Sequence, residues 1–181
     1  MTEDTKYEEF IEKFKHKKTT DDCYTPPKIY EVVKDWVLKE YKIDESKIVR
    51  PFYPGGDYEN FDYSGDKVVV DNPPFSILTK IIDFYLEHNI MFFLFANGLT
   101  LISLLNARKI CGICIGEKIK YENGAIVNTG FITNLDTKNI LRTAPELKEA
   151  LKIANGKKPR ASTGGGAVQV SLLCNKWCGI F

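Results

Sequence analysis

The sequence of 181 residues has no long hydrophobic run, and this argues against a membrane-spanning helix. Residues 1–18 are polar and highly charged, so no secretory signal sequence is expected and a cytoplasmic location is predicted. Histidine is scarce, with 2 residues, and the 5 cysteines are an odd number. A disulfide framework is therefore not expected, and we predict reduced thiols.

An excess of charge of one sign is also missing. Lysine and arginine number 25 and aspartate and glutamate 24, which gives a net charge of +1. This balance excludes a protein that binds nucleic acid through its bulk charge, so any such surface must be a local patch. Apolar residues make up 44% of the chain, which is enough for the core of about one domain.

The most informative stretch is 67–75, an apolar strand that ends abruptly in Asn72-Pro73-Pro74-Phe75. Neither proline has an N–H group to donate to a sheet, so the chain must leave the sheet at Asn72. A helical pattern follows directly after this motif. An amide, two fixed carbonyls and an aromatic ring are thus expected at the carboxyl end of a strand, where open α/β sheets bind ligands.

These four residues suit chemistry on an amine attached to a planar ring. Such an amine is a poor nucleophile, because its lone pair is delocalised into the ring. The side-chain oxygen of Asn72 and the carbonyl of Pro73 can accept both amine hydrogens and favour a tetrahedral nitrogen. Phe75 can stack on a base that has swung out of a duplex. The alternative is a plain strand terminator with a buried phenylalanine.

The string Asp-Asn-Pro-Pro-Phe-Ser at 71–76 resembles the adenine-specific DNA methyltransferases of the EcoRI-like phage and prophage family. A second string, Tyr-Glu-Asn-Gly-Ala-Ile-Val-Asn-Thr-Gly-Phe-Ile-Thr-Asn-Leu at 121–135, is similar to the same family. The resemblance covers about residues 19–150. It implies an α/β fold with a three-layer, Rossmann-like methyltransferase sheet. It also implies S-adenosylmethionine as cofactor, double-stranded DNA as partner and a role in DNA modification.

The resemblance extends to a segment upstream of the motif, Tyr24-Thr25-Pro26. By composition this segment is only the start of a helix, with Thr25 as N-cap and prolines in the first turn. Many amino-methyltransferases place a Thr-Pro segment here, over the methionine end of the cofactor. The resemblance therefore implies that Tyr24, Thr25 and Pro26 bind the cofactor.

The next predicted cofactor segment begins with a short strand at 48–50 and runs into a turn at Gly55-Gly56. Glycines allow the backbone to approach a ligand closely, although most such pairs are ordinary turns. In the family a glycine turn after the first strand lies under the cofactor. The cofactor-binding residues implied on this side are Phe52, Gly55, Gly56, Asp57 and Asp71.

The chain departs from the usual plan in the stretch 57–70. A full methyltransferase sheet has two more strand–helix units there, and this stretch has no room for them. We therefore predict a sheet reduced on one edge. The missing units supply acids for the cofactor ribose, so a catalytically inactive binding module is an open alternative. A methyltransferase acting on a protein glutamine amide is another, since the short motif alone permits it.

The rest of the chain predicts a helix from 77 to about 88, a buried strand at 90–96 and a helix at 99–107. A strand from 110 to about 121 follows, and Asn123-Gly124 predicts a hairpin turn with a return strand at 126–135. The sheet is therefore expected to end in an antiparallel hairpin. Residues 145–154 predict a last helix.

We expect three parts in the chain: an N-terminal amphipathic helix at 1–18, a methyltransferase-like domain at 19–155, and a glycine-rich basic linker with an apolar tail at 156–181. The tail is unlike the longer continuation that the resemblance implies, so a chain shortened at its C-terminus is expected. Four cysteines, Cys111 and Cys114 with Cys174 and Cys178, have a spacing that zinc sites use. The first pair lies in an apolar strand, so we predict no metal and buried thiols.

Overall fold

The computed structural model describes residues 24–52, 57–105 and 108–157. Within them one sheet of six strands runs in the order β1-β2-β3-β5-β4-β6. The strands are β1 Ile48–Val49, β2 Val68–Asp71, β3 Met91–Asn97, β4 Cys111–Lys120, β5 Ile126–Thr133 and β6 Leu141–Thr143. The helices are α2 Pro27–Tyr41, α3 Leu78–Glu87, α4 Leu101–Leu105 and α5 Pro145–Ala154, with 3-10 turns η2 Glu45–Lys47 and η3 Phe75–Ile77. The predicted N-terminal helix, the Gly55-Gly56 turn and almost all of the linker and tail lie outside the described residues.

The strand directions divide the sheet into a parallel part and one reversed strand. β1, β2 and β3 are parallel neighbours. β5 is antiparallel both to β3 and to β4, so β4 runs in the same direction as β3. β6 pairs in parallel with the beginning of β4. β5 is therefore the one described strand that runs against the others.

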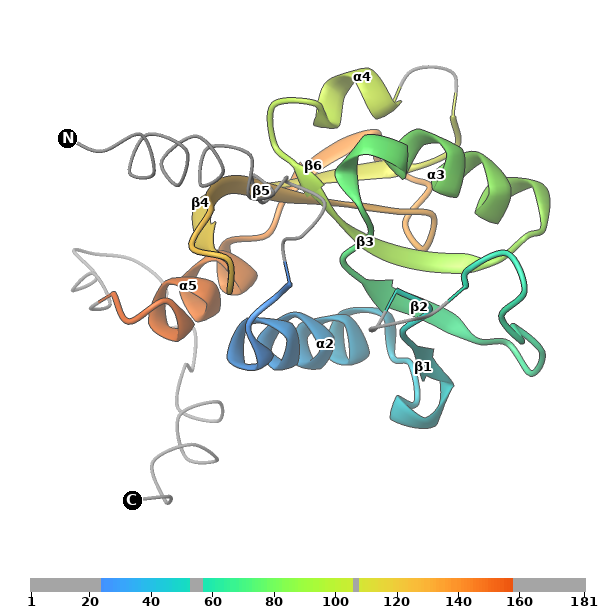
Figure 1. Ribbon diagram of the computed structural model, residues 1–181, viewed down its shortest axis with the longest axis horizontal. Coiled ribbons are helices and arrows are strands. Elements are labelled where there is room, and N and C mark those ends of the chain that lie inside the picture. The colour runs from blue at the N-terminus through green and yellow to red at the C-terminus, as the bar shows by residue number, and fades with distance from the viewer. Residues whose placement is uncertain (1–23, 53–56, 106–107, 158–181) are drawn as a thin grey trace, which may run out of the picture.

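Helices cover both faces of this sheet, which gives three layers (Figure 1). α2 and α5 pack on one face, where Val33, Leu147 and Phe93 share a hydrophobic core. α3 and α4 pack on the other face, where Ile81 and Leu101 share a second core with alternate residues of the same strands. β3 is buried on both faces, as its uninterrupted apolar sequence predicts. The predicted α/β class is thus confirmed.

The predicted reduction of one sheet edge is defined relative to a methyltransferase sheet and stays a prediction. β1 is the edge strand, and residues 57–67 contain turns but no helix or strand. None of the helices in the described ranges is long and apolar enough to cross a membrane.

The predicted hairpin is present but is not the last part of the sheet. β4 and β5 are joined by a tight turn in which Tyr121 N–H donates to the Ala125 carbonyl at 2.9 Å. Gly124 occupies the left-handed region at φ +84°, which its lack of a side chain permits. β6 follows the hairpin and forms the outer edge. The sequence did not predict β6, because the strand has only three residues and two of them are exposed.

Candidate functional site

The candidate site lies at the carboxyl edge of the parallel strands. Since β1, β2, β3 and β4 run in one direction, their last residues lie at the same edge of the sheet. Asn72-Pro73-Pro74 follows β2 without a gap, and η3 begins at Phe75. The prediction that the chain leaves the sheet at Asn72 is confirmed. Figure 1 shows α3 leading away from this point over the sheet.

Phe75 lies where the two cores approach each other. Its ring is half-buried and packs against residues of both hydrophobic clusters. Pro73 is buried, whereas Asn72 and Pro74 are only partly exposed. The backbone of the motif is thus held by packing on both sides. A partly exposed aromatic ring thus follows three residues after Asn72, at the carboxyl edge of the sheet.

The carboxylate of Asp71 fixes the backbone around this motif. Asp71 is 1% exposed, and its Oδ2 accepts a hydrogen bond from the backbone N–H of Phe52 at 2.8 Å. Its Oδ1 accepts one from the N–H of Asn72 at 2.9 Å. One buried side chain therefore ties the loop after β1 to the first residue of the motif.

Arg50 compensates the buried charge of Asp71. Its Nε lies 3.4 Å from Asp71 Oδ1, and its guanidinium lies over the ring of Tyr30 at 3.7 Å from the ring centre. Burial raises the pKa of Asp71, and the charge of Arg50 opposes that rise. Burial likewise raises the pKa of Tyr30. Arg50 thus joins α2, β1 and β2 at the carboxyl edge.

The loop after β1 carries Phe52 and Asp57, which the resemblance implies as cofactor ligands. The ring of Phe52 packs on Tyr58 with 5.3 Å between ring centres. Asp57 is exposed, and its carboxylate accepts hydrogen bonds from the side chain of Asn60 at 2.7 Å and from the N–H of Glu59 at 3.0 Å. These bonds, led by that of Asn60, hold the pKa of Asp57 below its usual value. The carboxylate of Asp57 therefore stabilises the loop in which it lies.

The segment before α2 differs from the prediction in one respect. The N-cap of α2 is Pro26 and no side chain caps the helix, so the predicted role of Thr25 as N-cap is wrong. Thr25 lies one residue too early, and the hydroxyl turns into the protein. The residue is 8% exposed, and its Oγ1 has no hydrogen-bond partner among the described residues. The Tyr24 carbonyl accepts a bond from the N–H of Glu122 at 3.1 Å.

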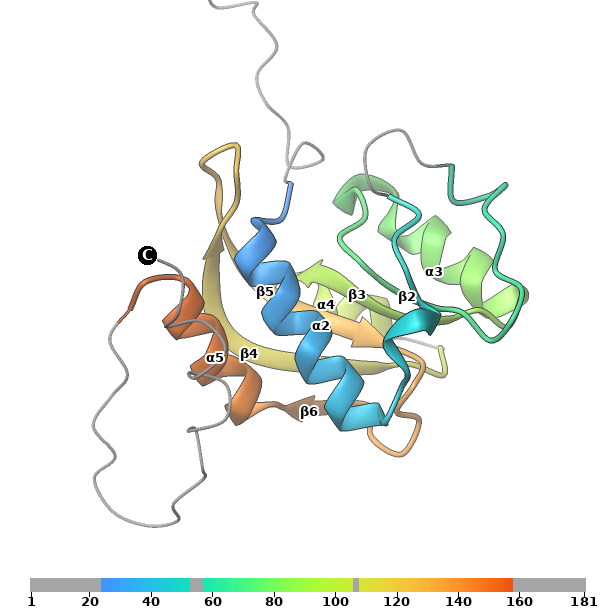
Figure 2. The same cartoon turned by 90° about the horizontal axis from the view of Figure 1, so that it is seen from below.

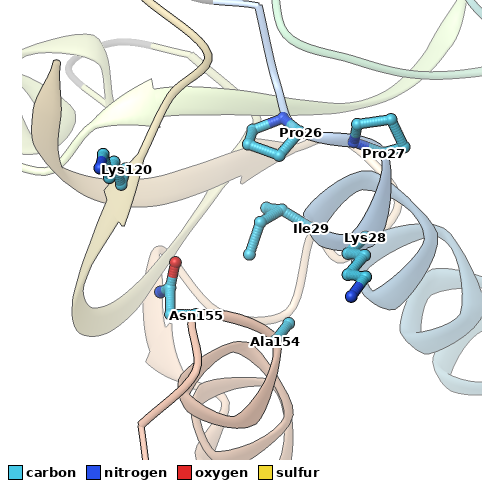
Figure 3. A pocket seen from close by; sticks show the side chains of 7 residues that line it. All are labelled: Pro26, Pro27, Lys28, Ile29, Lys120, Ala154 and Asn155. Atoms are coloured by element: carbon cyan, nitrogen blue, oxygen red, sulfur yellow. The ribbon is translucent and has the colours of Figure 1, made fainter. Parts of the chain in front are cut away.

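A hollow of about 490 Å³ lies beside the start of α2 (Figure 3). Its residues come from the start of α2, the end of β4 and the end of α5: Pro26, Pro27, Lys28, Ile29, Lys120, Ala154 and Asn155. The hollow shares Pro26 with the predicted site. It does not include the Asn72 motif, which lies at the end of β2.

The structure thus joins some of the predicted residues and leaves others apart. Asp71, Asn72 and Phe52 form one connected unit. Tyr24 and Pro26 lie beside the β4–β5 hairpin and the hollow. Gly55 and Gly56 lie outside the described residues. Arg50 and Tyr30 were not predicted, because their pairing with Asp71 depends on which strands are neighbours.

The described residues contain no group of three or more histidine, cysteine or acidic side chains that could hold a metal ion. Cys111 is buried and Cys114 is half-buried, both as free thiols. Burial raises the pKa of the Cys111 thiol. Cys174 and Cys178 lie outside the described residues, so the absence of a metal stays a prediction for this pair.

The fold and the site define a three-layer α/β protein with a proline-terminated strand at its carboxyl edge. Comparison with known proteins adds no relative: no protein-family model, curated protein or solved structure matches the chain.

Proposed function

We propose that this chain is a DNA adenine methyltransferase that transfers a methyl group from S-adenosylmethionine to the exocyclic amine of a flipped adenine. The observation that carries the proposal is the position of Asn72-Pro73-Pro74-Phe75 directly after β2, an inner parallel strand. The strand order supports it. In Rossmann-like methyltransferase sheets the catalytic strand is next to the first strand, and here β2 pairs in parallel with β1.

Each residue of the motif has a defined task in this proposal. The side-chain oxygen of Asn72 and the carbonyl of Pro73 accept the two amine hydrogens and keep the nitrogen lone pair directed at the methyl donor. Phe75 stacks on the base, and the packing on both sides holds its ring in place. Asp71 positions the motif by binding the N–H of Asn72. The transfer needs positioning more than proton transfer.

The cofactor, when bound, supplies an electrophilic methyl group. The residues present fit such a ligand in part. The buried hydroxyl of Thr25 has no hydrogen-bond partner in the described part of the chain, and a polar end of the ligand would satisfy it. The ring of Phe52 offers a partly exposed aromatic surface at the end of β1. Tyr24, Pro26, Gly55, Gly56 and Asp57 complete the proposed set.

Asn72→Ala tests the proposal. We expect this variant to lose at least about 100-fold in methyl transfer to duplex DNA, because one preorganised acceptor of the amine is removed. Transfer of a labelled methyl group to DNA measures the effect, and circular dichroism verifies the fold. Asn139→Ala, on an exposed loop at the opposite sheet edge, is the matched control and should keep full activity. Full activity in Asn72→Ala would refute the assignment.

A second candidate is a methyltransferase-like binding module without catalysis. Two observations favour it: β1 is the edge strand, and the carboxylate of Asp57 is already bound by its own loop. Calorimetric titration with S-adenosylmethionine separates the two candidates. Saturable binding that Thr25→Val weakens supports the enzyme. Absence of binding at millimolar cofactor supports the module.

A further inference from the structure

The two strands of the β4–β5 hairpin form an arm whose faces differ sharply in burial. Ile119 and Tyr121 point into the core under α2 and are almost fully buried. The opposite face carries Lys118 and Lys120, both exposed. Residues on the paired strand share this face, because Lys118 is opposite Asn128 and Lys120 is opposite Ile126.

The exposed face is positively charged, and Lys120 also lines the hollow beside the start of α2 and the end of α5. Lys118 and Lys120 form no ion pair with any residue in the described ranges. Glu117 lies on the buried face and is paired with Lys157. Glu122, in the turn, is the one exposed acid of the arm. Ile126, 65% exposed, adds an apolar side chain to the same face.

A bulge directs this arm beyond the sheet. The register of β4 against β5 shifts between Ile113 and Glu117, and Gly116 takes a left-handed conformation at φ +56°. Such a bulge bends the strand and re-aims the residues after it. Figure 2 shows the hairpin projecting past the body of the sheet.

The arm is also connected to the candidate site. The carbonyl of Asn128 accepts a hydrogen bond from the N–H of Gly98 at 2.7 Å. A side chain at Gly98 would meet the Asn128 amide at 3.1 Å, so the two strands are in close contact there. Gly98 directly follows β3, and β3 pairs with β2, which ends at the Asn72 motif. The charged face therefore lies on the same edge of the sheet as the motif.

We propose that this lysine face, defined by Lys118, Lys120, Ile126 and Asn128, contacts the phosphate backbone of duplex DNA. The inference rests on the proposed function, since it supplies the contact that holds DNA over the Asn72 motif. The two lysines complement the charge of phosphate, and a two-stranded ribbon has the width that the major groove admits. The net charge of the whole chain is only +1, so a local patch has to provide this attraction.

The test is a double variant of the whole chain that carries both Lys118→Gln and Lys120→Gln. Binding of a fluorescent duplex oligonucleotide is measured by anisotropy at several salt concentrations. We expect a loss of roughly 10-fold in affinity at low salt, and a decrease of about 1.8 in the slope of log affinity against log salt, since two phosphate contacts are removed. The control pair, Lys39→Gln with Lys109→Gln, has the same charge change at the opposite edge and should bind as the wild type does.

Three outcomes would overturn the inference: no duplex binding by the wild type, wild-type affinity and slope in the lysine variant, or an equal loss in the control pair. Failure of the proposed function is seen separately. If the wild type does not methylate DNA but its DNA binding still depends on Lys118 and Lys120, the DNA-binding surface is supported. The catalytic assignment is then refuted.

Discussion

At the scale of single residues, Asp71 determines the geometry of the carboxyl edge. The resemblance implies a cofactor-binding role for it, and that role stays a prediction. In the structure both carboxylate oxygens accept backbone hydrogen bonds, one from Phe52 and one from Asn72. The side chain therefore positions the loop after β1 and the motif after β2 relative to each other.

Asp71→Asn gives a pH-dependent prediction. Burial raises the folded-state pKa of Asp71 above the ordinary value of 3.8. Because folding raises this pKa, the carboxyl group contributes its full stabilisation of the folded protein below pH 3.8. This contribution is lost as the pH rises through the folded-state pKa. We expect the free energy of unfolding of the wild type, relative to Asp71→Asn, to fall as the pH rises from 3.5 to 7. Urea titrations of both proteins across this range measure it.

The opposite slope would contradict this reasoning. A wild type that gains stability over Asp71→Asn with rising pH would mean that Arg50 outweighs burial and lowers the pKa of the carboxyl group. The exposed Asp62→Asn is a suitable control. Its pKa is held below the usual value by bonds from Ser64, so its contribution should rise with pH instead.

At the scale of elements, Arg142 in β6 joins the outer edge of the sheet to the end of α2. Its Nη1 donates to Glu40 at 2.8 Å and its Nη2 to the hydroxyl of Tyr41 at 2.9 Å. Asp136 lies 3.1 Å from Nε, and the guanidinium also lies over the ring of Trp36. One planar group thus holds a strand that makes only three register pairs with β4.

We expect Arg142→Lys to lower the free energy of unfolding by about 1–3 kcal/mol. A lysine ammonium cannot reach all these partners in the plane of a guanidinium, and a half-buried acceptor would lose its hydrogen bond. Chemical denaturation measures the change. Arg108→Lys is the matched control, since Arg108 forms an exposed fork with Asp83 and its loss should cost less than about 1 kcal/mol. Both arginine side chains are 21% exposed, so equal effects at the two positions would show that the more buried partners of Arg142 have no influence.

At the scale of the whole molecule, the sheet couples two cores. α2 and α5 cover one, and α3 and α4 cover the other. Alternate residues of β3 enter each: Phe93 lies with the first core and Phe92 with the second. Phe75 packs against both. Because the same strands serve both cores, we expect the two layers to unfold together.

Ile81→Ala tests this coupling. Ile81 is a fully buried residue of α3, so its truncation should lower the free energy of unfolding by about 2–5 kcal/mol. The fluorescence of Trp36, which packs on Phe93 in the other layer, should report the same transition midpoint as far-UV circular dichroism. The chain has 2 tryptophans, so a Trp177→Phe background leaves Trp36 as the only fluorescent tryptophan. Separate midpoints for the two signals would show that the layers unfold independently.

The local sequence predicted those elements whose pattern is set within one segment. The apolar run of β3, the Asn-Gly turn between β4 and β5 and the departure of the chain at Asn72 are confirmed. Each depends on backbone chemistry within a few residues. The N-cap at Thr25 was wrong because a proline two residues later already fixed the helix start. β6 was missed because an exposed strand of three residues has no periodicity to detect.

By itself, therefore, the sequence determined the α/β class and the aromatic-amide motif at the end of a strand. Hydrophobic periodicity and proline geometry act within a short segment, so they can be recognised from the sequence without knowledge of the fold. Only the tertiary structure decided that Arg50, Asp71 and Phe52 meet, that Lys118 and Lys120 share an exposed face, and that β6 forms the outer edge of the sheet. These contacts join residues far apart in the chain, and strand order and register set them.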